Sequence, residues 1–188
     1  MPTCRTWPGV TEPGGRAPSL VFLHMKAILL IDHGSRRAEA NEMLYCMANL
    51  VQALAGPDVV VRPSHMELTE PTVAQGFSSC VSAGATEVIA FPYMLSPGRH
   101  STEHIPEMVA DAARTHPGVS FSVTPAFGVH EKLAELILER AGIAPTPWPA
   151  GGVEAPDCCW HPTGAEGTCG DACRARQAET IPVALRAP

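Results

Sequence analysis

The chain has 188 residues, which fits one domain of ordinary size with extensions at its ends. Its formal net charge of −6 argues against sequence-independent nucleic-acid binding, because such binding needs a basic surface that displaces counterions from phosphates. The sequence holds no run of about 18 uninterrupted apolar residues that could cross a bilayer. Its hydrophobic content of 45% is that of a soluble folded protein.

Prolines and glycines are concentrated near the two ends of the chain. Residues 1–25 show no periodic apolar pattern and are predicted to be a disordered leader. With only Arg5 and Arg16 as basic residues, this leader matches a targeting peptide poorly. Residues 26–143 are predicted to form the folded domain, and residues 144–188 a Pro/Gly-rich linker with a cysteine-bearing tail.

Apolar strands alternate with amphipathic helices through the middle of the chain. Strands are expected at 27–31, 59–66, 87–95 and 119–125, and helices at 37–54, 70–83, 102–115 and 129–140. The crossover connections that this order requires put the strands in a parallel sheet with helices on both faces. The predicted fold class is therefore α/β, with a four-stranded parallel sheet flanked by helices.

The helix expected at 37–54 predicts how the core is covered. Its apolar residues recur at three- and four-residue steps: Met43, Leu44, Met47, Leu50, Val51 and Leu54. This pattern predicts one buried stripe. Cys46 and Cys80 fall within predicted helices and are expected to be ordinary core residues.

Chemically versatile residues follow three of the four predicted strands. They are Asp32-His33-Gly34-Ser35, His65-Met66-Glu67 and Gly98-Arg99-His100. In open parallel sheets, ligands bind beyond the carboxyl ends of the strands. We therefore expect these residues to meet at one rim of the sheet and to form a functional site.

Imidazole and carboxylate side chains at this rim indicate metal or proton chemistry. His33 is a candidate metal ligand or base, and a hydrogen-bonded loop histidine is the alternative. Glu67 ends a mostly apolar strand and is a candidate ligand or base, with capping of the next helix as the alternative. His100 and His104 would share one helical face, so we expect His100 to be a ligand and His104 to orient its neighbours.

Three arginines, Arg36, Arg37 and Arg99, lie beside the predicted rim, and Arg62 lies further back along its strand. Any single arginine is ordinarily a solvated surface charge. Together these side chains could pair bidentately with carboxylates of an anionic ligand.

Several common catalytic motifs are missing from the sequence. No Gly-x-Gly-x-x-Gly or Walker loop follows the first strand, and no Gly-x-Ser-x-Gly elbow occurs. The string from His100 to His104 lacks the glutamate of the zinc-protease motif His-Glu-x-x-His. Nucleotide binding, serine hydrolysis and zinc proteolysis therefore have no support.

The motifs at the rim resemble the signature of the small class II chelatases, in particular the plant and algal sirohydrochlorin ferrochelatases and their short cobaltochelatase relatives. The matching strings are Asp32-His33-Gly34-Ser35-Arg36-Arg37, His65-Met66-Glu67-Leu68 with Glu70-Pro71-Thr72, and Pro97-Gly98-Arg99-His100 with His104-Ile105-Pro106. The resemblance covers residues 26–143. It implies ATP-independent insertion of Fe²⁺ into sirohydrochlorin to give sirohaem, in a plastid.

The resemblance also implies roles for individual residues. His33 and His100 become the metal-binding pair, and Glu67 a supporting acid or base. We expect the substrate's peripheral carboxylates to be bound by the polar residues beside them, which are Ser35, Arg36, Arg37 and Arg99.

A homodimer of one-lobe subunits is implied as well, because one rim offers a flat macrocycle only one wall. A cobalt or nickel chelatase of the same family is an alternative, since imidazole and carboxylate suit several divalent ions. A non-catalytic metal carrier or sensor is another.

Four cysteines gather in the tail: Cys158, Cys159, Cys169 and Cys173. Their spacing suits one metal or iron–sulfur centre, and a disordered tail with adventitious thiols is the alternative. The plant enzymes carry a cluster resembling a [2Fe–2S] site at this position, but theirs begins Cys-x-x-Cys. Because adjacent thiolates rarely bind one small ion, either Cys158 or Cys159 is in doubt, and His161 is an alternative ligand.

Overall fold

The computed structural model describes residues 24–128 and 130–146. The elements in chain order are β1 (Lys26–Asp32), α1 (Ala38–Ala55), β2 (Val59–His65), α2 (Val73–Ser82), β3 (Glu87–Pro92), the π-helix η1 (His100–His104), α3 (Ile105–Arg114), β4 (Ser120–Val123) and α4 (Glu131–Arg140). None of the helices in these ranges is both long and apolar enough to span a membrane.

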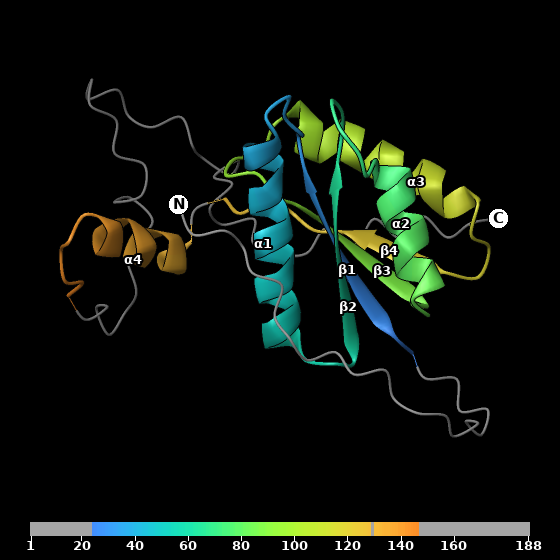
Figure 1. The fold of residues 1–188 in the computed structure, drawn as a ribbon, viewed down its shortest axis with the longest axis horizontal. Coiled ribbons are helices and arrows are strands. Elements are labelled where there is room, and N and C mark those ends of the chain that lie inside the picture. Colours follow the sequence, from blue (N-terminus) through green and yellow to red (C-terminus); the bar gives the residue numbers. More distant parts are fainter. Residues whose placement is uncertain (1–23, 129, 147–188) are drawn as a thin grey trace, which may run out of the picture.

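The four strands form one sheet in the order β2-β1-β3-β4, and every neighbouring pair is parallel. This confirms the predicted α/β class and its four-stranded parallel sheet. Because all strands run in one direction, their carboxyl ends lie at the same edge of the sheet (Figure 1). That edge is called the rim below.

The two faces of the sheet are covered by different helices. Alternate residues of β1 point to opposite faces, so Leu29 and Ile31 join the core beneath α2 and α3, whereas Leu30 packs beneath α1. Figure 1 shows α1 on one side of the strands and α2 with α3 on the other. The larger core cluster is centred on Phe77, which is fully buried.

The prediction of one buried stripe on α1 is wrong for three of its residues. Leu44 is buried, but Met43, Leu50 and Leu54 are exposed, Leu54 by 81%. A helix lying on a sheet buries only the narrow row of side chains that faces the strands, here Leu44 and Ala48. The remaining apolar residues leave α1 with an apolar outer surface.

The two helical cysteines differ in their surroundings. Cys80 is free and fully buried, as predicted, and burial raises the pKa of its thiol to about 11. Its thiol therefore stays protonated near neutral pH. Cys46 is only half-buried and belongs to neither core cluster, so the prediction that it is a core residue is wrong.

The elements differ from the predicted boundaries by at most three residues, and two of these differences lie near the rim. β3 ends at Pro92 instead of residue 95, although Tyr93 N–H still donates to the Ile31 carbonyl at 2.7 Å. The π-helix η1 precedes α3 and includes His100. Single π turns of this kind occur often at functional sites.

Helix α4 lies away from the sheet. Within the described ranges it packs on neither face, and Figure 1 shows it beyond α1. Leu136 and Ile137 are exposed, Ile137 by 68%. Helix α4 therefore leaves apolar side chains exposed in the described part of the chain.

Removal of a buried and of an exposed apolar side chain tests these faces. We expect Phe77→Ala to lower the free energy of unfolding by about 3–5 kcal/mol, because it leaves a cavity in the core. Leu54→Ala is expected to change it by less than about 0.5 kcal/mol. Urea unfolding followed by circular dichroism measures both values, and equal losses would contradict the assigned faces.

Candidate active site

Strands β1 and β2 end side by side at the rim, where Asp32 pairs with His65 in the parallel ladder. The pairing continues past the strands: Met66 N–H donates to the Asp32 carbonyl at 2.9 Å, and Glu67 N–H to the His33 carbonyl at 3.2 Å. The two loops therefore leave the sheet in parallel. As a result, His33 and Glu67 lie next to each other.

Gly34 allows these loops to touch. Its φ of +84° is a left-handed conformation that side chains rarely adopt, and an added Cβ would lie 2.0 Å from the Glu67 carbonyl oxygen. Its N–H donates to Asp32 Oδ1 at 2.9 Å. The turn after His33 therefore lies directly against the loop that carries Glu67.

Three of the predicted side chains meet at the rim. His33 Nε2 lies 2.8 Å from Glu67 Oε1, and the ring centroids of His33 and His100 are 5.2 Å apart at an interplanar angle of 83°. With metal–nitrogen bonds of about 2.1 Å, two imidazoles on one ion also have centroids about 5 Å apart. The His33 and His100 rings are thus spaced to share an ion.

His104 contacts His100 from the next turn of the helix. Their Nδ1 atoms are 3.1 Å apart, so one of them donates a proton to the other. With Nδ1 engaged in this way, Nε2 is the nitrogen of His100 that remains available to another partner. A hydrogen bond that selects the ligating nitrogen in this manner is usual for metal-binding histidines.

The rim does not form a closed metal cage. Among the residues that the structure describes, no three His, Cys, Asp or Glu side chains are arranged to hold a metal ion. Closed four-ligand sites retain their ion, whereas reactive sites keep positions open. The described part of the rim is therefore not a closed four-ligand site.

The start of α1 is fixed by an asparagine that the sequence reasoning missed. Ser35 N–H donates to Asn41 Oδ1 at 2.9 Å, and Asn41 Nδ2 donates to the Ser35 carbonyl at 2.8 Å. Ser35 Oγ accepts the N–H of Arg37 at 3.1 Å. The sequence signal for this contact was an asparagine in the first turn of the helix, six residues after Ser35.

The arginines divide as expected between the rim and the body of the domain. Arg36 and Arg37 are exposed at the start of α1. Arg99 is 78% exposed and forms an ion pair with Glu103 at 3.4 Å. Arg62 instead donates to Ser79 Oγ at 3.2 Å, behind the rim.

His65 is a further residue that sequence reasoning did not single out. It is fully buried, and its Nδ1 lies 2.5 Å from Asp32 Oδ1. His65 lies in the His65-Met66-Glu67 string expected at the rim, but its pairing with Asp32 depends on the strand register and has no signal in the sequence. Its Nε2 has no hydrogen-bond partner in the described part of the chain.

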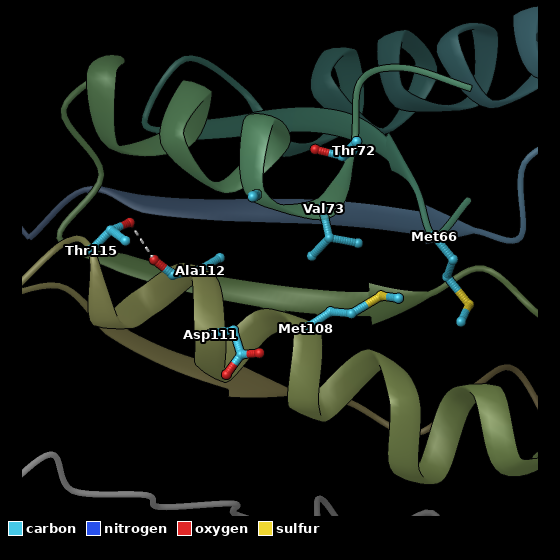
Figure 2. Close-up of a pocket in the computed structure, with 8 residues that line it drawn as sticks. Met66, Thr72, Val73, Met108, Asp111, Ala112 and Thr115 are labelled. Carbon is cyan, nitrogen blue, oxygen red and sulfur yellow. Dashed lines mark hydrogen bonds between the residues drawn. The ribbon is translucent and has the colours of Figure 1, made fainter. Parts of the chain in front are cut away.

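A groove of about 340 Å³ lies between α2 and α3, and no histidine among the described residues lines it (Figure 2). Met66, Val73 and Met108 give it an apolar lining, and Asp111 in its wall is ion-paired with Arg114. Met66 lies at one end of the groove in Figure 2. This lining offers few polar groups for a specific ligand.

The predicted cysteine centre lies outside the described residues. Cys158, Cys159, Cys169 and Cys173 all belong to residues 147–188, as does His161. The iron–sulfur centre therefore stays a sequence prediction.

The fold and the rim together define an α/β protein with a paired-imidazole site at the carboxyl ends of a parallel sheet. The sequence profile of the CbiX family matches residues 27–144. This match covers well over half of the chain. The chain belongs to the CbiX family.

Individual relatives agree with this assignment. A protein of Arabidopsis thaliana named sirohydrochlorin ferrochelatase, chloroplastic, is 41% identical over 60% of this chain and 50% of its own length. A sirohydrochlorin cobaltochelatase of Methanococcoides burtonii is 35% identical over 61% of this chain and 92% of its own.

A solved structure gives the same picture. The sirohydrochlorin chelatase SirB from Bacillus subtilis subspecies spizizenii, in complex with cobalt, has a TM-score of 0.55 and 30% identity, covering 62% of this chain and 50% of that chain. The chain thus spans about half the length of this protein and of the Arabidopsis relative.

Two glycine variants test the contact between the loops. Gly34→Ala and Gly56→Ala both place a side chain at a similar positive φ, +84° and +80°, but only Gly34 faces a backbone atom. We expect Gly56→Ala to cost about 1–2 kcal/mol of strain and Gly34→Ala clearly more, because the two loops must separate. Urea unfolding measures the difference. Equal costs would show that the loops do not touch.

Proposed function

We propose that this protein is a sirohydrochlorin ferrochelatase, which inserts Fe²⁺ into sirohydrochlorin to form sirohaem without ATP. The observation that carries the proposal is the placement of the His33 and His100 rings 5.2 Å apart at the rim, with Glu67 against His33. The substrate is supported by relatives that are named for the same tetrapyrrole.

In this mechanism the metal replaces a proton. His33 Nε2 and Glu67 Oε1, 2.8 Å apart, share a proton in the free protein, since one of the two must donate. Fe²⁺ binds His33 Nε2 and His100 Nε2, and the shared proton leaves to water. Imidazole ligands hold the ion while the macrocycle displaces its water molecules.

Glu67 then acts as the base for the ring. Insertion of one divalent ion releases two protons from the pyrrole nitrogens, so the charge of the ring and metal together is balanced. The Glu67 side chain is 54% exposed and lies beside the ion's position. It accepts these protons in turn and passes them to water.

Charged residues at the edge of the site bind the outside of the macrocycle. Arg36 and Arg37 are exposed at the start of α1 and bind carboxylates of the substrate. Ser35 and Arg99 contribute from the two neighbouring loops. Because Arg99 already pairs with Glu103, it must exchange that partner for a substrate carboxylate.

The choice of Fe²⁺ rests on the Arabidopsis ferrochelatase at 41% identity, and the word chloroplastic in its name supports a plastid location. A cobalt chelatase is the second candidate, because the Methanococcoides relative is a cobaltochelatase. Imidazole and carboxylate ligands suit both ions. Assays of metal insertion distinguish these two activities from nickel insertion and from metal carriage without turnover.

A homodimer supplies the second wall of the pocket in this proposal. The matched part, 62% of this chain, covers 50% of the SirB chain, so two copies of the matched part would equal its length. Helix α4 carries apolar residues that do not pack on its own sheet, and α1 has an apolar outer surface with Met43 and Leu50. These apolar surfaces favour association of two subunits.

The dimer is tested by a charge placed on α4. We expect Ile137→Glu to convert a dimer into a monomer in light scattering after size exclusion, because a carboxylate cannot be buried at an apolar interface without a partner. The control Glu139→Lys changes a charge on an exposed polar position of the same helix. A monomeric wild-type chain, or two dimeric variants, would contradict the proposal.

The metal-binding pair is tested in an anaerobic insertion assay. The purified protein is mixed with sirohydrochlorin and Fe²⁺, Co²⁺ or Ni²⁺, and the absorbance change is followed. We expect His33→Ala and His100→Ala each to lower the rate by more than the 10- to 100-fold that loss of a ligand-supporting group costs.

The control is His24→Ala, which removes an exposed imidazole before β1, at the opposite edge of the sheet. It should leave the rate unchanged. Normal rates in both test variants would refute the ligand assignment. No acceleration by the wild-type protein with any metal would favour the carrier or sensor.

A further inference from the structure

We infer that His65 and Asp32 form a positioning pair that sets the distance between His33 and Glu67. The inference rests on the proposed function, and it assigns to His65 a part in the reaction that does not involve contact with the metal or the macrocycle. It starts from a fully buried histidine at the end of β2.

The pair links the two loops from below. Asp32 Oδ1 accepts two hydrogen bonds, one from Gly34 N–H at 2.9 Å and one from His65 Nδ1–H at 2.5 Å. One carboxylate oxygen thereby fixes the turn that carries His33 and the end of the strand that leads to Glu67. Any shift of Asp32 moves both loops.

The surroundings of His65 leave it little freedom. The His65 side chain is fully buried, and its backbone N–H donates to the Pro71 carbonyl at 2.8 Å. The centroid of the Tyr45 ring, on α1, lies 6.2 Å from the centroid of the imidazole. Because Nδ1–H points to Asp32, the tautomer is fixed, with Nε2 as the bare nitrogen.

The fold tolerates an unfavourable feature to keep this histidine. Nε2 is buried with no partner among the described residues, and buried polar atoms without hydrogen bonds are uncommon. A phenylalanine would fill the same space without that defect. The histidine therefore contributes something that an apolar ring cannot, and the bond to Asp32 is the only such contribution of its ring in the described structure.

The dependence of the reaction on this pair follows from its position. His33 and Glu67 contact each other at 2.8 Å across two separate loops, so a small displacement of either loop breaks that contact. Groups that orient metal ligands typically change affinity or activity by about 10- to 100-fold when they are removed. In this inference, Asp32 and His65 are the groups that orient His33 and Glu67.

Two substitutions of His65 separate positioning from packing. His65→Asn places an amide N–H where Nδ1–H was, but leaves a cavity. His65→Phe fills the space and removes the donor. If His65 has a purely structural role, the variant that is less stable should also be the less active one. If His65 positions the loops, the variant that keeps the N–H donor should stay active even though it is less stable.

The test compares these variants with the wild type in three measurements: kcat and KM for metal insertion, Co²⁺ affinity of the protein without tetrapyrrole, and the midpoint of thermal unfolding. We expect His65→Phe to lower kcat and Co²⁺ affinity by about tenfold with an unchanged KM for the tetrapyrrole. His65→Asn should stay within about threefold of the wild type, although it unfolds at a lower temperature.

His116→Asn is the matched control, because His116 is bonded to Ser78 Oγ at 2.9 Å near the end of α3, away from the rim. It should lower stability and leave kcat and Co²⁺ affinity unchanged. If His65→Phe kept both, or if His65→Asn lost as much as His65→Phe, the inference would be wrong. If the wild type itself inserted no metal, the proposed function would fail, and Co²⁺ affinity alone would decide the role of His65.

Discussion

The parallel pairing of β1 with β2 up to Asp32 and His65 is the constraint on which the rim depends. Backbone hydrogen bonds continue this pairing into the two loops, and Gly34 lets the loops approach to contact. His33 and Glu67 are neighbours only because neither loop can move independently. The chemistry at the rim therefore rests on backbone geometry that a change of side chain at His33 or Glu67 would leave in place.

The segment after the third strand brings His100 to the rim. β3 ends at Pro92, and the chain then crosses the rim to η1, where His100 stands over His33. His104 holds the His100 ring through its Nδ1 atom. The loops after three strands thus bring Glu67, His33 and His100 together at the rim, while α2 and α3 cover one face of the sheet.

The fold and the rim could be predicted from sequence because they depend on patterns that are local in the chain. Apolar runs followed by amphipathic helices define a parallel sheet, and a parallel sheet gathers the residues after its strands at one edge. His33, Glu67 and His100 can be identified in this way without knowledge of the distances between them.

Other features depend on contacts between distant segments, and these the sequence did not reveal. Whether Met43 and Leu54 are buried or exposed depends on which side of α1 meets the sheet, and the spacing of apolar residues alone does not decide that. His65 acquires its role only from its register opposite Asp32, 33 positions away in the chain. Leu68 adopts a positive φ of 68° in the turn after Glu67, which its residue type does not predict.

The most direct test of the account is X-ray absorption spectroscopy of the full chain with one equivalent of Co²⁺ per subunit and no tetrapyrrole. The account predicts a first shell that contains two imidazole nitrogens, with one lost in His33→Ala and one in His100→Ala. A first shell of sulfur atoms, or one that neither substitution changes, would place the ion elsewhere and contradict the central claim.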